Sequence, residues 1–192
     1  MKSHFFAYIS RMRFIQRWAL MRNTAQENVQ EHSHQVAVLA HALALIRREI
    51  LGLEGPDPDR CATAALYHDA SEILTGDLPT PIKYHDPQIR AAYKRVERLY
   101  GERLLDMLPP ELRSHYAPYV LEEDLELAPI VKGADKLSAY IKCIEELKTG
   151  NSEFDSAAKQ TLSAIEAMDR PELRWFVEHC LPAFSLNLDE LN

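Results

Sequence analysis

Apolar residues recur every three or four positions along most of the chain, which is the spacing that places them on one face of an α-helix. The stripe is clearest between residues 27 and 50, where its apolar positions are Val29, Val36, Leu39, Leu43, Ile46 and Ile50. No stretch alternates cleanly between apolar and polar residues, and clusters of β-branched residues are few. The pattern therefore predicts an all-α protein.

Proline, glycine and capping residues mark where these helices start and stop. Asp57 followed by Pro58 starts one helix, and Gly150 ends another. We expect helices over about residues 3–16, 27–50, 58–76, 87–107, 110–119 and 127–149, and further helices from about residues 152 and 171. Two prolines interrupt residues 77–81, which we expect to form a loop.

The length of 192 residues fits one domain. We expect a core of about residues 28–150, with an N-terminal helix and C-terminal helices packed on it. The N-terminal segment carries four arginines among apolar residues and no acid before Glu27, a pattern that an amphipathic transit peptide shares. It lacks a serine-rich stretch, so we favour the packed helix.

The net charge of −7 argues against binding of a nucleic-acid polymer, because such binding needs Lys and Arg to neutralise many phosphates. A small molecule with a single phosphate needs far less positive charge. Cys61, Cys143 and Cys180 form no C-x-x-C pair, which is typical of reduced thiols in a cytoplasmic protein. No apolar run reaches the roughly 18 residues that span a membrane. We therefore expect a cytoplasmic protein without a membrane partner.

Four polar residues lie on faces that the apolar pattern predicts to be buried. His32 lies in the apolar stripe of its helix, and Asp135 adjoins the buried side of another. His68 and Asp69 follow the apolar face of a third. A buried carboxylate without a partner is costly, and one cation held between facing helices would satisfy all four side chains. Each residue alone has a plainer explanation, such as a hydrogen-bonded core histidine or a surface ion pair.

The pattern His32…His68-Asp69…Asp135 resembles the H…HD…D signature of the HD-domain metal phosphohydrolases, which are all-helical. Four further stretches, which extend the resemblance to YfbR-type bacterial 5'-deoxynucleotidases, are residues 17–18, 27–33, 67–72 and 75–81. The resemblance covers nearly the whole chain. It implies a single-domain HD helical bundle, a homodimer, and a metal-dependent 5'-nucleotidase that converts deoxyribonucleoside 5'-monophosphates to deoxyribonucleoside and inorganic phosphate.

The expected ligands of one divalent metal ion are His32, His68, Asp69 and Asp135. Two imidazoles and two carboxylates suit Co, Mn, Zn, Fe or Ni better than Mg, which prefers oxygen ligands. Such an ion lowers the pKa of bound water from about 15.7 toward 7 and polarises a phosphate. Since an open metal position can hold a phosphate oxygen, we also expect His32, Asp69 and Asp135 to contact the substrate.

Glu72 lies four residues after His68 and three after Asp69, so on a continuous helix its carboxylate would sit beside the metal ion. We expect it to be a catalytic residue that orients or deprotonates water, or protonates the leaving oxygen. The alternative is a solvated glutamate at the end of a helix.

Arg17 is a candidate phosphate clamp and catalytic residue, because its guanidinium is forked and always charged. The resemblance implies that Trp18 contacts the sugar or base, where crowding would exclude a ribose 2'-hydroxyl. It also implies that the loop after Gly76 contacts the nucleoside and that Asp77 assists catalysis by proton transfer. The loop residues concerned are Asp77, Leu78, Pro79 and Thr80.

Two other functions fit the same features. One is another HD phosphohydrolase that acts on a nucleoside triphosphate, an alarmone or a cyclic nucleotide. A triphosphate or alarmone would need more Lys and Arg around the site than Arg17 and Arg22 supply. The other is a non-catalytic helical module that senses nucleotides.

Overall fold

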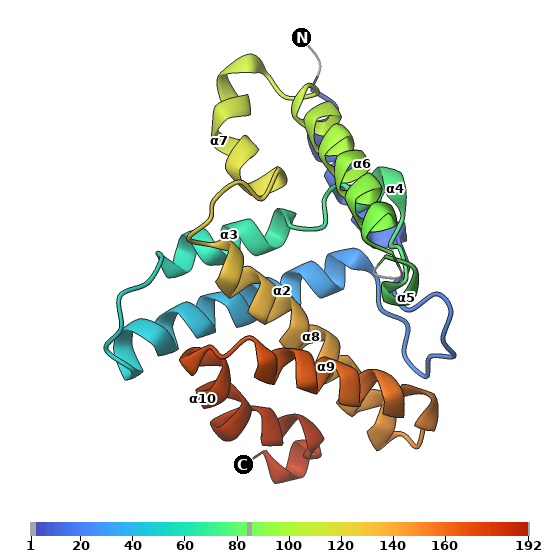
Figure 1. The fold of residues 1–192 in the computed structure, drawn as a ribbon, viewed down its shortest axis with the longest axis vertical. Coiled ribbons are helices and arrows are strands. Elements are labelled where there is room, and N and C mark those ends of the chain that lie inside the picture. The colour runs from blue at the N-terminus through green and yellow to red at the C-terminus, as the bar shows by residue number, and fades with distance from the viewer. Residues whose placement is uncertain (1–2, 84–85, 192) are drawn as a thin grey trace.

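The computed structural model describes residues 3–83 and 86–191, with Thr80 and Pro81 described by their backbone alone. Within these residues the single piece of β-structure is an isolated bridge between Gln16 and Asn28, so the expected all-α fold is confirmed. The α-helices in Figure 1 are α1 (Phe5–Ile9), α2 (Val29–Leu45), α3 (Pro58–Tyr67), α4 (Glu72–Thr75), α5 (Thr80–Lys83), α6 (Pro87–Leu105), α7 (Pro110–Val120), α8 (Ala128–Lys148), α9 (Asp155–Ala167) and α10 (Pro171–His179). A π-helix covers Ile46–Ile50, and 3-10 helices cover Ser10–Phe14, Ser152–Phe154, Leu181–Ser185 and Leu188–Glu190.

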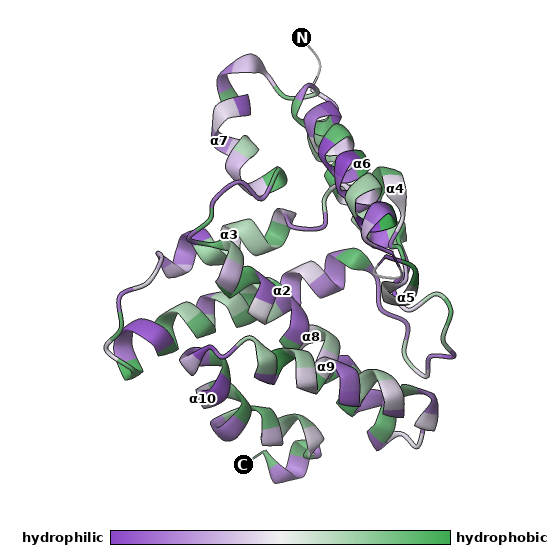
Figure 2. Ribbon diagram, in the orientation of Figure 1, coloured by the Kyte–Doolittle hydropathy of each residue, from purple (hydrophilic) through white to green (hydrophobic). Residues whose placement is uncertain are grey.

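The centre of the molecule is α2, which packs against α3 and α8 (Figure 1). Most of the predicted apolar stripe is buried there, with Val36 and Leu43 fully covered. Ile50 at its end is the exception, because it is 53% exposed in the π-helix that follows α2. Leu137 and Ile141 of α8 belong to the same cluster. Figure 2 shows apolar and hydrophilic residues alternating around the helices, as such one-sided burial requires. Each fully buried Leu, Ile or Val contributes about 1.5–3 kcal/mol, so this contact fixes the positions of the three helices.

Local sequence determines where two of these helices begin. The Asn28 side chain accepts hydrogen bonds from the backbone N–H groups of Gln30 and Glu31, and Glu31 returns a bond to Asn28, which completes a capping box. At the start of α3 the Asp57 side chain accepts from the backbone N–H groups of Asp59 and Arg60, and Pro58 occupies the first turn, as predicted. Because α2 begins directly after Asn28, His32 lies in its first two turns.

The helix expected over residues 58–76 is wrong in one respect, because it breaks at His68. α3 ends at Tyr67, a turn follows, and α4 starts at Glu72. Ring atom Nδ1 of His68 bonds to the carbonyl oxygen of Ala65 at 2.7 Å, an oxygen that a continuing helix would use for a backbone bond. The His-Asp pair therefore lies in a turn and not on a continuous helical face.

The N-terminal segment consists of two short helices and not of one helix over residues 3–16. α1 starts at Phe5 rather than Ser3 and passes into a 3-10 helix at Ser10. The Ser10 hydroxyl donates to the Ala7 carbonyl at 3.0 Å, and this local bond competes with regular helical bonding. Phe5 is fully buried, so the segment packs on the rest of the molecule.

Two smaller differences concern loops. The segment expected as a loop over residues 77–81 contains the start of α5, because the N–H groups of Ile82 and Lys83 donate to Pro79 O at 2.9 and 3.1 Å. Proline is compatible with a first helical turn, so its presence did not exclude this helix. The helix expected from residue 152 begins as a 3-10 turn, and α9 proper starts at Asp155.

Of the C-terminal helices, α9 packs against α8, and α10 packs against α2 and the π-helix that follows it (Figure 1). The carboxylate of buried Glu172 fixes α10 through Arg47 at 3.0 Å and Arg170 at 2.8 Å. Among the residues that the structure describes, no helix combines the length and the apolar character needed to cross a membrane.

Candidate metal centre

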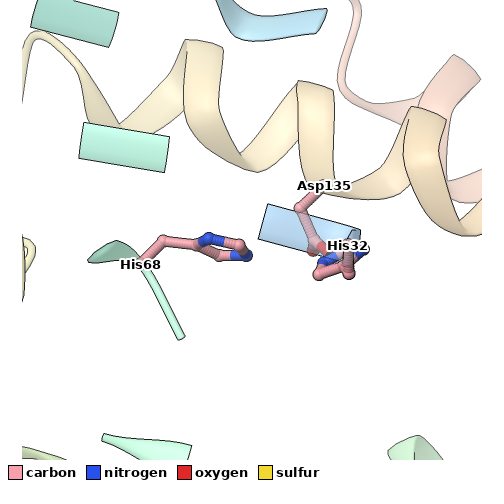
Figure 3. Close-up of side chains that lie close together, drawn as sticks. All are labelled: His32, His68 and Asp135. Carbon is pink, nitrogen blue, oxygen red and sulfur yellow. Dashed lines mark ion pairs between the residues drawn. The ribbon is translucent and has the colours of Figure 1, made fainter. Parts of the chain in front are cut away.

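The four expected ligands come from three elements that the core holds together. His32 lies on α2, Asp135 on α8, and His68 and Asp69 in the turn after α3. Ligand atoms of His32, His68 and Asp135 all lie within 4.8 Å of one another, and Figure 3 shows the His68 ring pointing toward the other two. Oδ2 of Asp69 lies 3.1 Å from His68 Nε2 and 3.6 Å from His32 Nε2. The structure therefore brings all four side chains together.

Hydrogen bonds on the outer side of each imidazole determine which ring nitrogen faces the centre. Ser138 donates its hydroxyl hydrogen to Gln35 Oε1 at 2.7 Å, so its oxygen accepts from His32 Nδ1 at 3.1 Å. The Ala65 carbonyl, which can only accept, fixes the hydrogen of His68 on Nδ1. In the neutral rings, both Nε2 lone pairs consequently point at the centre, as metal-binding histidines require.

These Nε2 atoms fit a cation. Both are buried and make no hydrogen bond to any described residue. A carboxylate oxygen lies close to each of them, with Asp135 Oδ1 3.2 Å from His32 Nε2 and Asp69 Oδ2 3.1 Å from His68 Nε2. Lone pairs that face each other at this distance repel unless a proton or metal ion lies between them. The donor set of two nitrogens and several carboxylate oxygens suits a divalent transition metal.

The charges around the centre favour added positive charge. Burial lowers the pKa of His32, and Arg17 lowers it further. Burial also lowers the pKa of His68, but the adjacent Asp69 carboxylate outweighs this effect and raises it to about 10. Burial raises the pKa values of Asp69 and Asp135, but the histidines and neighbouring cations hold both below their usual range, so both carboxylates are charged.

Arg17 lies at the edge of this centre, where the sequence hypothesis places the phosphate. Its Nη1 is 3.6 Å from Asp69 Oδ2, and its Nε donates to Glu27 Oε2 at 3.0 Å. Burial lowers the pKa of the guanidinium, but Asp69 and Glu27 more than offset this effect and raise it. Arg17 is therefore a fixed positive charge beside the expected metal ligands.

Trp18 directly follows Arg17 and is held by the same carboxylate. Its indole Nε1 donates to Glu27 Oε2 at 2.9 Å, and its ring centroid lies 5.3 Å from that of Phe154. Its backbone φ of 58° lies in the left-handed region, which is uncommon for a bulky residue. Contacts with Glu27 and Phe154 stabilise this unusual conformation.

Glu72 is buried, so the alternative of a solvated glutamate is wrong. Its Oε2 has no hydrogen-bond partner among the described residues. Burial raises its pKa well above the usual value, and Asp69 and Asp77 raise it further. Burial likewise raises the pKa of Asp77, although the positive charge of Arg17 acts to lower it. Both acids therefore lie within electrostatic reach of the centre.

The remaining residues expected to contact the nucleoside lie in the segment after α4. Leu78 and Pro79 are half-buried in the short segment between Asp77 and α5. The side chain of Thr80 lies outside the described part of the chain.

Two residues near the centre were not expected from sequence. Lys83 on α5 bonds to Glu97 at 2.7 Å, and its charge acts on Glu72 and Asp69. Glu27 holds both residues of the Arg-Trp pair. The spacing of residues along the chain could not identify Lys83 or Glu27. Their bonding partners lie in other segments, and the hydrophobic pattern does not predict how those segments are placed relative to one another. The similarity of residues 27–33 to the family was the one available pointer to Glu27.

Comparison with known proteins gives a consistent result across the whole chain. The family model for 5'-deoxynucleotidase YfbR-like proteins matches residues 4–184. A 5'-deoxynucleotidase of Vibrio parahaemolyticus is 48% identical over 196 residues, which cover 100% of this chain and 99% of that protein. The 5'-deoxynucleotidase YfbR of Escherichia coli is 48% identical over 193 residues, which cover 100% of this chain and 96% of that protein.

Solved structures share the fold. An HD-domain phosphohydrolase from Listeria innocua matches with a TM-score of 0.81 at 23% identity, over 94% of this chain and 88% of that chain. A cyanophage S-2L HD phosphohydrolase, bound to dA and one catalytic Zn2+ ion, matches with a TM-score of 0.66 at 22% identity, over 92% of this chain and 95% of that chain. These likenesses establish the HD-domain helical fold.

Proposed function

The chain belongs to the YfbR-like 5'-deoxynucleotidase family, and from this premise we propose which residues carry out its reaction. The enzyme is a phosphoric monoester hydrolase that converts deoxyribonucleoside 5'-monophosphates to deoxyribonucleosides and inorganic phosphate. The observation that carries the assignment of its site is the pair of buried Nε2 atoms of His32 and His68, which make no hydrogen bond to a described residue and face two carboxylates.

His32, His68, Asp69 and Asp135 would hold one divalent transition-metal ion, with Co, Mn, Zn, Fe or Ni favoured over Mg. The outer hydrogen bonds of both histidines support this assignment, because they leave each Nε2 free. The catalytic Zn2+ ion of the cyanophage HD phosphohydrolase agrees with it. When bound, the ion supplies a Lewis acid for the phosphate and a more acidic water.

Arg17 binds the substrate phosphate. Its Nε is engaged by Glu27, which leaves donors of its forked guanidinium for phosphate oxygens next to Asp69. His32, Asp69 and Asp135 line the same space and contact the phosphate group. A fixed, buried cation costs little reorganisation when charge develops in the transition state.

Glu72 and Asp77 handle protons. The buried carboxyl of Glu72 holds a proton more tightly than a surface glutamate, so it is suited to protonate the leaving 5'-oxygen or to orient the attacking water. Asp77, in the segment after α4, lies within electrostatic reach of Arg17 and assists this transfer.

Trp18 and residues 77–80 recognise the nucleoside. The indole is fixed between Glu27 and Phe154 beside the phosphate-binding arginine, so it lies at the sugar end of the substrate. Crowding by the ring excludes a ribose 2'-hydroxyl and selects deoxyribose. Asp77, Leu78, Pro79 and Thr80, in and after the segment that follows α4, contact the base or sugar.

The enzyme acts as a cytoplasmic homodimer. The buried free thiols of Cys61 and Cys143 suit a reducing compartment.

The contact between the two copies would form on α6, where the apolar residues Ile89, Val96 and Leu99 are exposed.

A panel of ribo- and deoxyribonucleoside 5'-monophosphates, assayed with each metal, tests these assignments. We expect phosphate release from the deoxy series with Co, Mn or Zn and little from the ribo series. Pyrophosphate released from a triphosphate would favour another HD phosphohydrolase activity. Tight nucleotide binding by the metal-loaded protein without turnover would favour a sensor.

A further inference from the structure

One carboxylate oxygen holds two neighbouring side chains at the proposed substrate site. Oε2 of Glu27 accepts from Arg17 Nε at 3.0 Å and from Trp18 Nε1 at 2.9 Å. Glu27 and Arg17 are each only 12% exposed, so water does not replace these bonds easily. Consecutive side chains normally point in different directions, and the left-handed backbone of Trp18 lets both meet the same acceptor.

The backbone of Glu27 is also fixed. Its carbonyl accepts from Arg17 N at 2.9 Å, and the bridge between Gln16 and Asn28 continues this pairing. Asn28 caps α2, which carries the metal ligand His32. Glu27 therefore lies where the segment with the Arg-Trp pair is joined rigidly to the helix that carries a metal ligand.

The loop between Trp18 and Glu27 has a separate anchor. The buried carboxylate of Glu146 accepts from the backbone N–H groups of Thr24 and Ala25, and from the Thr24 hydroxyl and the Asn151 amide. This anchor does not involve Glu27. Removal of the Glu27 side chain should therefore free the Arg-Trp pair without releasing the loop.

We infer that Glu27 is a positioning residue that couples phosphate binding to sugar selection, an inference that rests on the roles proposed for Arg17 and Trp18. Its negative charge orients the guanidinium with its free donors toward the phosphate. The same oxygen fixes the edge of the indole that faces the sugar. Loss of Glu27 should therefore impair turnover and deoxyribose selectivity together, although no hydrogen bond or ion pair among the described residues links the Glu27 side chain to an expected metal ligand.

The test compares kcat/KM for dAMP and AMP in the metal-loaded enzyme and in four variants. Glu27→Ala should lower kcat/KM for dAMP by up to about 100-fold, because misplacement of a binding group by about 1 Å has such effects. It should also lower the dAMP-to-AMP ratio toward that of Trp18→Ala. Arg17→Ala should lose activity with both substrates. Glu153→Ala, which removes an exposed tether of the same loop at Arg22, should behave as wild type.

Two further measurements separate positioning from folding. In a Trp175→Phe background, Trp18 is the single tryptophan, and Glu27→Ala should shift its emission while the thermal midpoint stays close to that of the parent. Glu27→Gln keeps the shape and an acceptor for the indole but loses the charge. It should retain the dAMP-to-AMP ratio and lower kcat/KM for both nucleotides, and it provides the test even where Glu27→Ala is unstable.

The outcomes are distinct. Wild-type rates and selectivity in both Glu27 variants, alongside strong effects in Arg17→Ala and Trp18→Ala, would overturn the role of Glu27 and leave the proposed function intact. Near-wild-type behaviour of Arg17→Ala and Trp18→Ala would overturn the proposed roles themselves, and the positioning role with them.

Discussion

Glu72 differs from the other buried acids because its Oε2 is buried without a hydrogen-bond partner among the described residues. A carboxylate in that position carries a cost of desolvation, which native proteins seldom accept without a functional reason. Asp69 and Asp77 surround it with further negative charge. This environment favours the protonated form and suits a residue that transfers a proton.

Replacement of Glu72 by alanine should slow dAMP turnover by about 10²–10⁴-fold, which is the usual contribution of a general acid or base. The metal content should stay at one ion per chain, because Glu72 is not among the proposed ligands. Steady-state kinetics with metal analysis of the same sample checks both points. Glu49→Ala, at a solvent-exposed glutamate, is the control. Normal turnover in Glu72→Ala would exclude the catalytic role.

Ser138 sets the orientation of His32, since its hydroxyl accepts from Nδ1 and donates to Gln35. Ser138→Ala should weaken metal affinity by about 10–100-fold, the range found for partners of metal-binding histidines. Competition with a chelator measures this loss. The matched control is Ser33→Ala, because Ser33 is equally buried and its hydroxyl bonds to no described residue. Equal affinities in both variants would contradict the orienting role.

At the scale of elements, the site depends on one irregular turn and one anchored loop. The turn after α3 points both His68 and Asp69 toward α2 and α8. A continuous helix would not point two consecutive residues in the same direction. The loop before α2 is fastened to α8 through Glu146, whose carboxylate also bonds to the buried Lys142. Met21 of this loop also packs against the cluster of Cys143, Phe154 and Ala158, and the bonds to Glu146 add to that packing.

Glu146→Ala should lower the free energy of unfolding by about 3–5 kcal/mol, because it leaves Lys142 as a buried, unpaired charge. Urea unfolding followed by circular dichroism measures this change. The double variant Glu146→Ala with Lys142→Met should recover part of the loss. A single variant as stable as wild type would show that the anchor is dispensable.

The same residue predicts a dependence of stability on pH. Burial raises the pKa of Glu146, but bonds from Lys142, Asn151 and Thr24 outweigh this effect and hold it well below 4.5. Its contribution is therefore present above the pKa of the unfolded chain and is lost as pH falls toward the folded value. Wild type should lose stability below about pH 4.5 more steeply than Glu146→Gln does. Parallel curves would contradict this reasoning.

Several features could be predicted from sequence because they depend on local chemistry. Asp57 with Pro58 fixes the start of α3, and the apolar stripe of α2 fixes its buried face. The break at His68 was missed because the helical period continues through it, and the bond to Ala65 that interrupts the helix involves a side chain. Spacing offered four candidate ligands, but only the fold brings three separate elements to one point.

At the scale of the whole molecule, an all-helical core supports a site assembled from distant segments. The family model matches residues 4–184, so the N-terminal segment with the Arg-Trp pair lies within the same match as the proposed metal ligands. The exposed apolar residues of α6 are the surface on which the proposed homodimer would form.

Light scattering should therefore give a mass twice the 22.0 kDa of one chain. Val96→Glu with Leu99→Glu should shift the protein toward monomer, because charges on an apolar contact are not solvated there. The control is Leu188→Glu, at an exposed leucine of the C-terminal 3-10 helix. A monomeric wild type would refute the dimer.

Metal analysis of wild type, His32→Ala and His68→Ala, each purified identically and incubated with Mn, Co or Zn, tests the central claim most directly. Wild type should retain one transition-metal ion per chain after desalting and release phosphate from dAMP. Each histidine variant should lose both the ion and the activity. A wild type that hydrolyses dAMP without bound metal, or variants that keep the ion, would show that these imidazoles do not form the centre.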